Sequence, residues 1–202
     1  SDSTGPLEGA DMMDAMQGDH NPYTKFNYGW VTSSRLVVAE ENVTLTLEAF
    51  HKNGDTIIIA NNWDDALGAY QEYYVLLYYK NVTLNSGNGG YFDDEGILVY
   101  HVNASLYKET FEGDTYYDVY NNNTDISDET GYGTEDNLIE FVKSANKKFV
   151  YGVGDTMPTT VKDDSNNSLV YNFTVDAITA EDVQEMAIKI FDKDRISKLI
   201  YI

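Results

Sequence analysis

The sequence predicts a mainly β protein, an antiparallel sheet or sandwich with a short helix near the N-terminus and few other helices. After Val31, apolar and polar residues alternate in several short runs, which is the pattern of half-buried strands. Two further runs, at 72–80 and 96–103, are almost entirely apolar or aromatic, and tyrosines and branched residues favour strands. Such runs separated by turn residues are typical of all-β folds.

The composition indicates a folded, strongly acidic chain. It has 202 residues, with 13 Lys and Arg against 34 Asp and Glu, a formal net charge of −21. This charge repels phosphates, so we expect no nucleic-acid partner. Hydrophobic residues make up 42% of the chain, too many for a disordered acidic protein. Cysteine is absent, which excludes disulfides and thiolate chemistry, and no apolar run reaches the ~18 residues that a membrane span needs.

The first thirty residues differ from the rest and are expected to form a separate unit, residues 1–30. Ser1–Gly18 is predicted to be loop around a short methionine-rich patch. A helix is expected from about Pro22 to Tyr28, because Asn21 can cap it and proline is favoured at the first helical position. Gly29 is expected to end it.

Residues 31–202 are expected to form one mainly β region. The alternating and apolar runs predict strands at 34–39, 43–51, 56–61, 72–80 and 96–103. Of these, 72–80 is expected to be a central strand buried on both faces. Between the second and third strands, Asn53 and Gly54 form a pair that two-residue hairpin turns favour.

The second half of this region gives weaker signals. A long surface loop is expected at 104–134, with one candidate strand around 116–120. Residues 137–142 fit a helical turn or a strand equally well. The remaining apolar runs predict a short strand at 149–153 and a closing hairpin formed by 169–178 and 187–192.

Few residues stand out as candidates for chemistry. His20, His51 and His101 are far apart in sequence, whereas a catalytic zinc site usually takes closely spaced imidazoles. No nucleophile elbow or phosphate-binding loop is present. Acidic clusters offer oxygen ligands for calcium, although solvated acidic turns are the favoured interpretation of each. These clusters are Asp93, Asp94 and Glu95; Asp11, Asp14 and Asp19; Asp125, Asp128 and Glu129; and Asp163 with Asp164.

The tyrosines of the run at 72–80 have two interpretations. They could form a platform on which a sugar stacks, or they could pack inside the protein. Packing in a buried strand is favoured, because the whole run is apolar or aromatic. The four residues concerned are Tyr73, Tyr74, Tyr78 and Tyr79.

Residues 5–31, GPLEGADMMDAMQGDHNPYTKFNYGWV, resemble the stretch that follows the zinc-binding helix in immune inhibitor A-like secreted bacterial metallopeptidases. Asp11–Asp14 fits the methionine turn of that family, and Thr24–Trp30 fits its helix end. EYYVLLYYK, at 72–80, and DDEGILVYHVN, at 93–103, are similar to two of its strands, with Gly96 and His101 in agreement.

This resemblance implies the C-terminal half of a secreted or cell-surface bacterial zinc endopeptidase. The HExxH motif is not among these residues, so zinc would be held by an upstream peptidase segment, and this chain alone is predicted to be inactive on protein or peptide substrates. Met12 or Met13, followed by Asp14, would form an apolar floor under the zinc. His20 is the best candidate for an active-site rim or carbonyl-polarising residue, with helix capping as its alternative.

The resemblance gives Trp30 the role of anchoring the helix end, with substrate contact as the less favoured role. Two other interpretations of the whole chain are open. One is a catalytically dead homologue kept as a scaffold. The other is a non-catalytic all-β surface module that binds sugar or a partner protein through exposed tyrosines.

Overall fold

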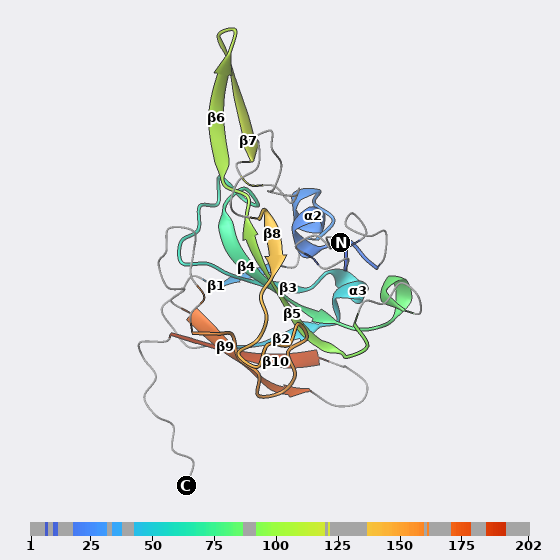
Figure 1. Ribbon diagram of the computed structural model, residues 1–202. Helices are drawn as coiled ribbons and strands as arrows, with labels where there is room; N and C mark the ends of the chain where they lie inside the picture. Colours follow the sequence, from blue (N-terminus) through green and yellow to red (C-terminus); the bar gives the residue numbers. More distant parts are fainter. Residues whose placement is uncertain are drawn as a thin grey trace.

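The described part of the chain folds into two packed β-sheets, with two short α-helices on the outer face of the larger sheet and a separate hairpin (Figure 1). The structure, a computed structural model, describes residues 7, 10–11, 18–31, 34–37, 43–86, 92–119, 121, 137–159, 161, 171–178 and 185–192. Over these residues the predicted mainly β, largely antiparallel fold with few helices is confirmed. No helix among them is long and apolar enough to cross a membrane.

The larger sheet, here the main sheet, has five strands in the order β1-β3-β4-β5-β8. Strand β1 runs parallel to β3, and all other neighbours are antiparallel. Strand β4 lies in the centre and is buried from its second residue onwards, as the dense apolar run predicted. The strands are β1 (Ser34–Val37), β3 (Thr56–Ile59), β4 (Glu72–Tyr79), β5 (Gly96–Asn103) and β8 (Ile139–Phe141).

The smaller sheet, here the small sheet, covers one face of the main sheet. It consists of β2 (Val43–Glu48), β10 (Glu185–Asp192) and β9 (Tyr171–Ile178), all antiparallel. The closing hairpin of β9 and β10 is therefore confirmed, and its expected turn lies outside the described residues. The core between the sheets is filled by alternate side chains, which include Leu47, Leu76, Val99 and Phe173.

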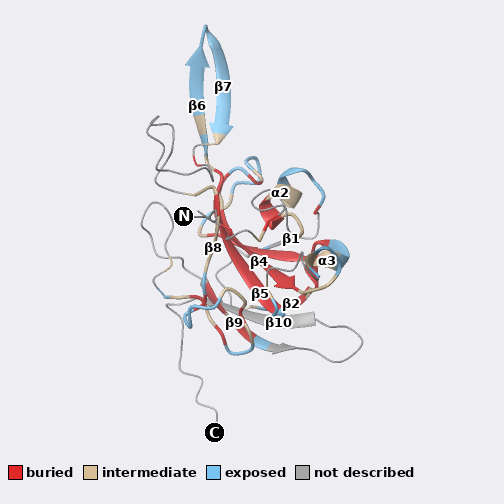
Figure 2. Ribbon diagram, turned by 45° about the vertical axis from the view of Figure 1, so that its right-hand side comes forward, coloured by how far each residue is buried: buried red, intermediate tan, exposed pale blue. Residues whose placement is uncertain are grey.

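The opposite face of the main sheet, here the helix face, packs against α2 (Pro22–Asn27) and α3 (Phe50–Asn53) (Figure 2). The predicted start of α2 is confirmed, because the Asn21 side chain accepts a hydrogen bond from the Thr24 amide. Tyr23 of α2 and the following Val31 lie in the same core as the helix-face side chains of β4 and β5.

The expected hairpin turn at Asn53 and Gly54 is wrong. Strand β2 pairs with β10, and α3 carries the chain from the small sheet across to the main sheet. Ala49 packs between the sheets, whereas Phe50 packs on the helix face, which is why the strand predicted to reach His51 ends at Glu48. Gly54 ends α3 with a φ of 74°. Glycines with a positive φ are common both at helix ends and in two-residue hairpin turns, so the sequence signal is the same for the two structures.

Part of the expected long loop at 104–134 is ordered as a second hairpin. Strand β6 (Leu106–Phe111) pairs with β7 (Asp114–Val119), and β7 contains the candidate strand as far as Val119, with Tyr120 outside the described residues. Residues 137–142, which fitted a helix or a strand, contain β8. The strand expected at 149–153 is reduced to a single bridge between Tyr151 and Ile97. A bridge of one pair is enough to bury Tyr151 against the core.

Candidate functional site

A small pocket opens on the helix face, between the segment before α2, helix α3 and strands β4 and β5, and its roughly 380 Å³ of empty space include open solvent. Leu77 of β4 and Leu98 of β5 give it apolar lining, because the side chains of these strands that point to the helix face alternate along them. Polar groups line it as well, both at its rim and through the phenols of Tyr79 and Tyr100. The lining residues are Ala10, Gly18, Asp19, His20, Phe50, Leu77, Tyr79, Asn85, Phe92, Leu98 and Tyr100.

Asp19 is held firmly at the rim of the pocket. Its amide donates a hydrogen bond of 3.0 Å to Asn85 Oδ1, and its Oδ1 accepts one of 2.8 Å from the His20 amide. Its other oxygen forms an ion pair with Lys25 Nζ. Lys25 in turn lies 4.6 Å above the centre of the Phe50 ring. These contacts join the segment before α2 to α3 and to the loop after β4, and they fix the backbone at His20.

The His20 imidazole lies at this rim with one nitrogen unsatisfied. Its ring meets the Trp30 ring edge-on, with 5.5 Å between centroids. Nδ1 of His20 is buried and has no hydrogen-bond partner. A buried polar atom without a partner costs free energy, and such atoms are uncommon in native proteins. His20 does not cap α2, since Asn21 does so, and the capping alternative is therefore wrong.

The segment in which the methionine turn was predicted is described only at its ends, and residues at both ends line the same pocket. Asp11 is buried, and its carboxylate accepts hydrogen bonds from the amide and the side chain of Asn21, at 2.7 and 3.2 Å. This ties the segment to the start of α2. The predicted floor residues Met12, Met13 and Asp14 lie outside the described residues. The residues on either side of them, Ala10 and Gly18, both line the pocket.

Two tyrosines form the buried side of the pocket. The Tyr79 hydroxyl donates a hydrogen bond of 3.2 Å to the backbone oxygen of Phe92. Burial raises the pKa of Tyr100 far above its usual value, and the negative charges of Asp11 and Asp19 add to this effect. The Tyr100 phenol is therefore a neutral hydrogen-bonding group at neutral pH. The tyrosines of β4 are core residues, as the packing interpretation predicted, and not an exposed sugar platform.

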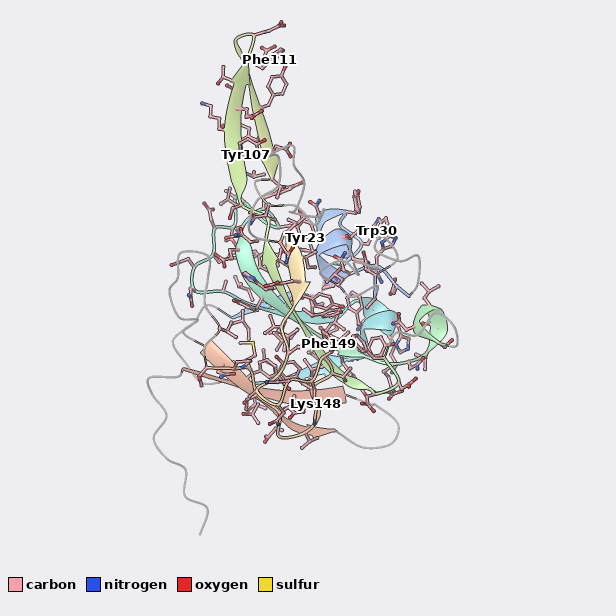
Figure 3. The ribbon with its side chains drawn as sticks, in the orientation of Figure 1. Tyr23, Trp30, Tyr107, Phe111, Lys148 and Phe149 are labelled. Carbon is pink, nitrogen blue, oxygen red and sulfur yellow. The ribbon has the colours of Figure 1, made fainter. Side chains whose placement is uncertain are left out.

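Trp30 does not anchor the end of α2 to the sheet, and that prediction is wrong. Its side chain is 60% exposed, beside the 66% exposed Tyr28, whose ring centroid is 5.3 Å away (Figure 3). Gly29, with a φ of 69°, turns the chain after the helix and directs Trp30 outwards. These two rings form an exposed aromatic patch next to the pocket, and the half-buried ring of His20 meets Trp30 at its edge.

His101 lies on the other side of the main sheet from the pocket. The His101 and Tyr74 side chains lie on the same face of the main sheet, and their rings stack with 4.7 Å between centroids. The Nε2 atom of His101 is 2.8 Å from Glu72 Oε1. Its Nδ1 is 3.6 Å from Glu140 Oε1. Burial lowers the pKa of His101, but its hydrogen bonds with Glu140 and Glu72 outweigh burial and raise the pKa to about 9. His101 is thus a cation that joins β4, β5 and β8.

The predicted calcium ligands are not gathered into a site in the described part of the chain. Asp93, Asp94 and Glu95 are exposed in the turn before β5, and Glu95 pairs with Lys80 at 3.6 Å. Among the described residues, no three His, Asp or Glu side chains are placed to hold a metal ion. Other acidic residues named as candidates lie outside the described residues: Asp14, Asp125, Asp128, Glu129, Asp163 and Asp164.

Sequence reasoning singled out His20 but missed most of its surroundings. Asn85 lies in the short 3₁₀ helix Thr83–Asn85, and no sequence signal connects it with Asp19, which is 66 positions away. Phe92 and Phe50 were also missed, because single aromatic residues are far more often core residues than site residues. Comparison with known proteins adds no evidence, since no family model, no curated protein and no solved structure matches this chain.

Proposed function

We propose that this chain is the C-terminal half of a zinc endopeptidase domain of the immune inhibitor A-like kind, and that its pocket is part of the substrate site. The observation that supports the proposal is a coincidence of position. The segment with the family resemblance lies beside the pocket wherever the structure describes it before α2, since Gly18, Asp19 and His20 line the pocket.

The pocket residues do not by themselves fit a zinc ion. A catalytic zinc takes three protein ligands, usually imidazoles with or without a carboxylate. The described lining offers one imidazole, His20, and one carboxylate, Asp19, whose oxygens are already used by Lys25 and by the His20 amide. The proposal therefore assigns the zinc ligands to an upstream peptidase segment, and it predicts no hydrolysis by this chain alone.

The chain's own residues would bind and orient a peptide. The Nδ1 of His20 is unsatisfied but buried, so the imidazole would have to turn toward the pocket before this atom could donate a hydrogen bond to a substrate carbonyl oxygen. Leu77 and Leu98 give the pocket apolar surface that an apolar group of the peptide could contact. Lys25 holds Asp19, and Asp19 holds the backbone of His20, so the backbone that carries the imidazole is positioned before a substrate binds.

Two aromatic groups beside the pocket supply a surface for the upstream segment. One is the exposed patch of Tyr28 and Trp30. The other is a cluster of three half-buried rings. The centroids of these rings are 5.5 to 5.6 Å from one another, and the residues are Phe92, Phe141 and Phe149. Covering such rings with a second polypeptide stabilises the complex by burying apolar area.

The test compares this chain with a longer protein. The chain is expressed alone and together with the segment that precedes it in its reading frame, and zinc-dependent cleavage of casein is measured. We expect cleavage only by the pair, loss of cleavage with a chelator, and about a 10²-fold lower kcat for His20→Ala if the imidazole polarises the carbonyl. His51→Ala, a histidine that does not line the pocket, is the control.

The outcomes separate the competing interpretations. Cleavage by this chain alone would overturn the assignment of the zinc ligands to another segment. A folded pair without any cleavage would favour a catalytically dead scaffold or a binding module. Equal activity of His20→Ala and the unchanged pair would remove His20 from the site but leave the rest of the proposal standing.

A further inference from the structure

The hairpin of β6 and β7 projects away from the body of the protein (Figure 1). Its strands pair with each other and with no other described strand. Glu112 and Gly113 form its turn with φ values of 51° and 92°, as the favoured two-residue hairpin turns require. Apart from Tyr107 and Val119, every residue of the hairpin is exposed, which Figure 2 shows as a pale blue ribbon.

One face of this hairpin has an ordered chemical pattern. Residues that are paired across two antiparallel strands lie on the same face, and successive pairs alternate between the two faces. Every second pair here consists of one aromatic residue and one carboxylate. These three pairs, here called the acidic-aromatic face, are Tyr107 with Asp118, Tyr116 with Glu109, and Phe111 with Asp114.

The acidic-aromatic face has no positive charge of its own. Lys108, the one basic residue of the hairpin, pairs with Tyr117 and therefore lies on the opposite face. Phe111 and Tyr116 are 65% and 51% exposed, so these large rings are not used to fill a core (Figure 3). An aromatic ring is negative on its face, so a ring beside a carboxylate adds a second group that attracts cations.

The spacing of the three pairs matches an extended polypeptide. Successive pairs are two residues apart along the strands, which is about 7 Å. In an extended segment, alternate side chains point to the same side at the same interval. A Lys or Arg at each alternate position would therefore meet one ring and one carboxylate, combining a cation–π contact with an ion pair.

We propose that the acidic-aromatic face binds an extended segment of a partner protein that has Lys or Arg at alternate positions. The overall charge of −21 brings such a segment to the protein, since attraction between opposite charges speeds association. The register of the hairpin then supplies the selectivity, because only alternate basic side chains reach all three pairs at once.

The test uses the full chain and two fluorescent peptides of identical composition. One peptide alternates Lys and Thr, and the other has all its Lys residues in one block; binding is followed by fluorescence anisotropy at physiological salt. We expect the alternating peptide to bind at least about fivefold more tightly. The double variant Phe111→Thr, Tyr116→Thr keeps the net charge and the strand propensity, and we expect it to weaken binding about fivefold or more.

Two controls separate the hairpin face from the general charge. Tyr117→Thr removes a ring with a similar exposed fraction, 66%, from the opposite face and should leave the affinity unchanged. Removing three exposed carboxylates elsewhere, with Asp93→Asn, Asp94→Asn and Glu95→Gln, should weaken binding less than the same number of neutral substitutions at Glu109, Asp114 and Asp118.

Equal binding of the two peptides would overturn the proposal, because affinity would then follow net charge alone. Equal loss from the ring substitutions on both faces would do the same. Circular dichroism of each variant checks that the hairpin is retained; if the double variant loses it, the comparison of the two carboxylate triples decides the question.

Discussion

The ion pairs of His101 should make the stability of this protein depend on pH in a predictable way. The perturbation is His101→Gln, which keeps a hydrogen-bond donor near Glu72 but does not titrate. In the folded protein the pKa of His101 is raised to about 9, whereas an unperturbed histidine has a value of 6.5. The charged form is therefore favoured by folding, and it is lost as the pH rises through about 9.

The magnitude follows from the pKa difference. Each unit of pKa corresponds to about 1.4 kcal/mol, so a rise from 6.5 to about 9 contributes roughly 3 kcal/mol when the pH is below 6.5. This contribution declines as the pH rises and falls to a few tenths of a kcal/mol near pH 9.5. At the acid end, the hydrogen bond from His101 lowers the pKa of Glu140 despite the opposing effect of burial, so its contribution is lost as the pH falls through that lowered pKa.

The assay is urea unfolding of the unchanged protein and His101→Gln at pH 6.0, 7.5 and 9.5. Other titrating groups are common to both proteins and cancel in the difference. We expect that difference to shrink by about 2 to 3 kcal/mol between pH 6.0 and pH 9.5. His51→Gln is the matched control, because burial and the nearby Lys80 lower the pKa of His51 and its stability difference should change with pH in the opposite sense.

A pH-independent difference for His101→Gln would refute the reasoning. It would mean that the side chain contributes by packing on Tyr74 and not by its charge. NMR titration of the His101 ring gives an independent check, since its midpoint should lie well above that of His51.

Three further substitutions test the packing described above. Gly96→Ala should destabilise the protein by about 1 to 3 kcal/mol in urea unfolding, because the added Cβ would lie 2.4 Å from the backbone oxygen of Tyr151. Asn172→Ala should cost about 2 to 4 kcal/mol by calorimetry, because the Asn172 side chain bonds both the buried amide and the carbonyl of Met157 at 3.2 Å. Asn21→Ala should cost about 1 kcal/mol by removing the cap of α2. If the unfolding midpoint of a variant equals that of the unchanged protein, the contact described for that residue does not stabilise the fold.

Local sequence signals predicted those helices and strands whose limits and buried faces are set by residues close together in the sequence. Asn21, Pro22 and Gly29 specify the start and end of α2 within one short segment. The runs at 72–80 and 96–103 become β4 and β5 almost residue for residue, because a continuous apolar run can only be accommodated where both faces are covered. The resemblance made His20 a candidate site residue; the structure places it at the rim of a pocket, and its role in a site stays a prediction.

Pairing between distant segments required the tertiary structure. A positive φ at Gly54 serves a hairpin turn or a helix end equally well, and the choice depended on β2 pairing with β10 far along the chain. The ion pairs of His101 likewise depend on which strands lie beside β5. Asn85 reaches Asp19 because the loop after β4 returns to the helix face.

The sequence by itself determined most of the longer strands, the place of the first helix and the acidity of the chain, since these properties reside in residues close together along the chain. The tertiary structure alone decided the strand order, the pocket and the projecting hairpin. The physical reason is that strand pairing gains its free energy from apolar faces meeting across long separations, and many pairings agree with the same local pattern.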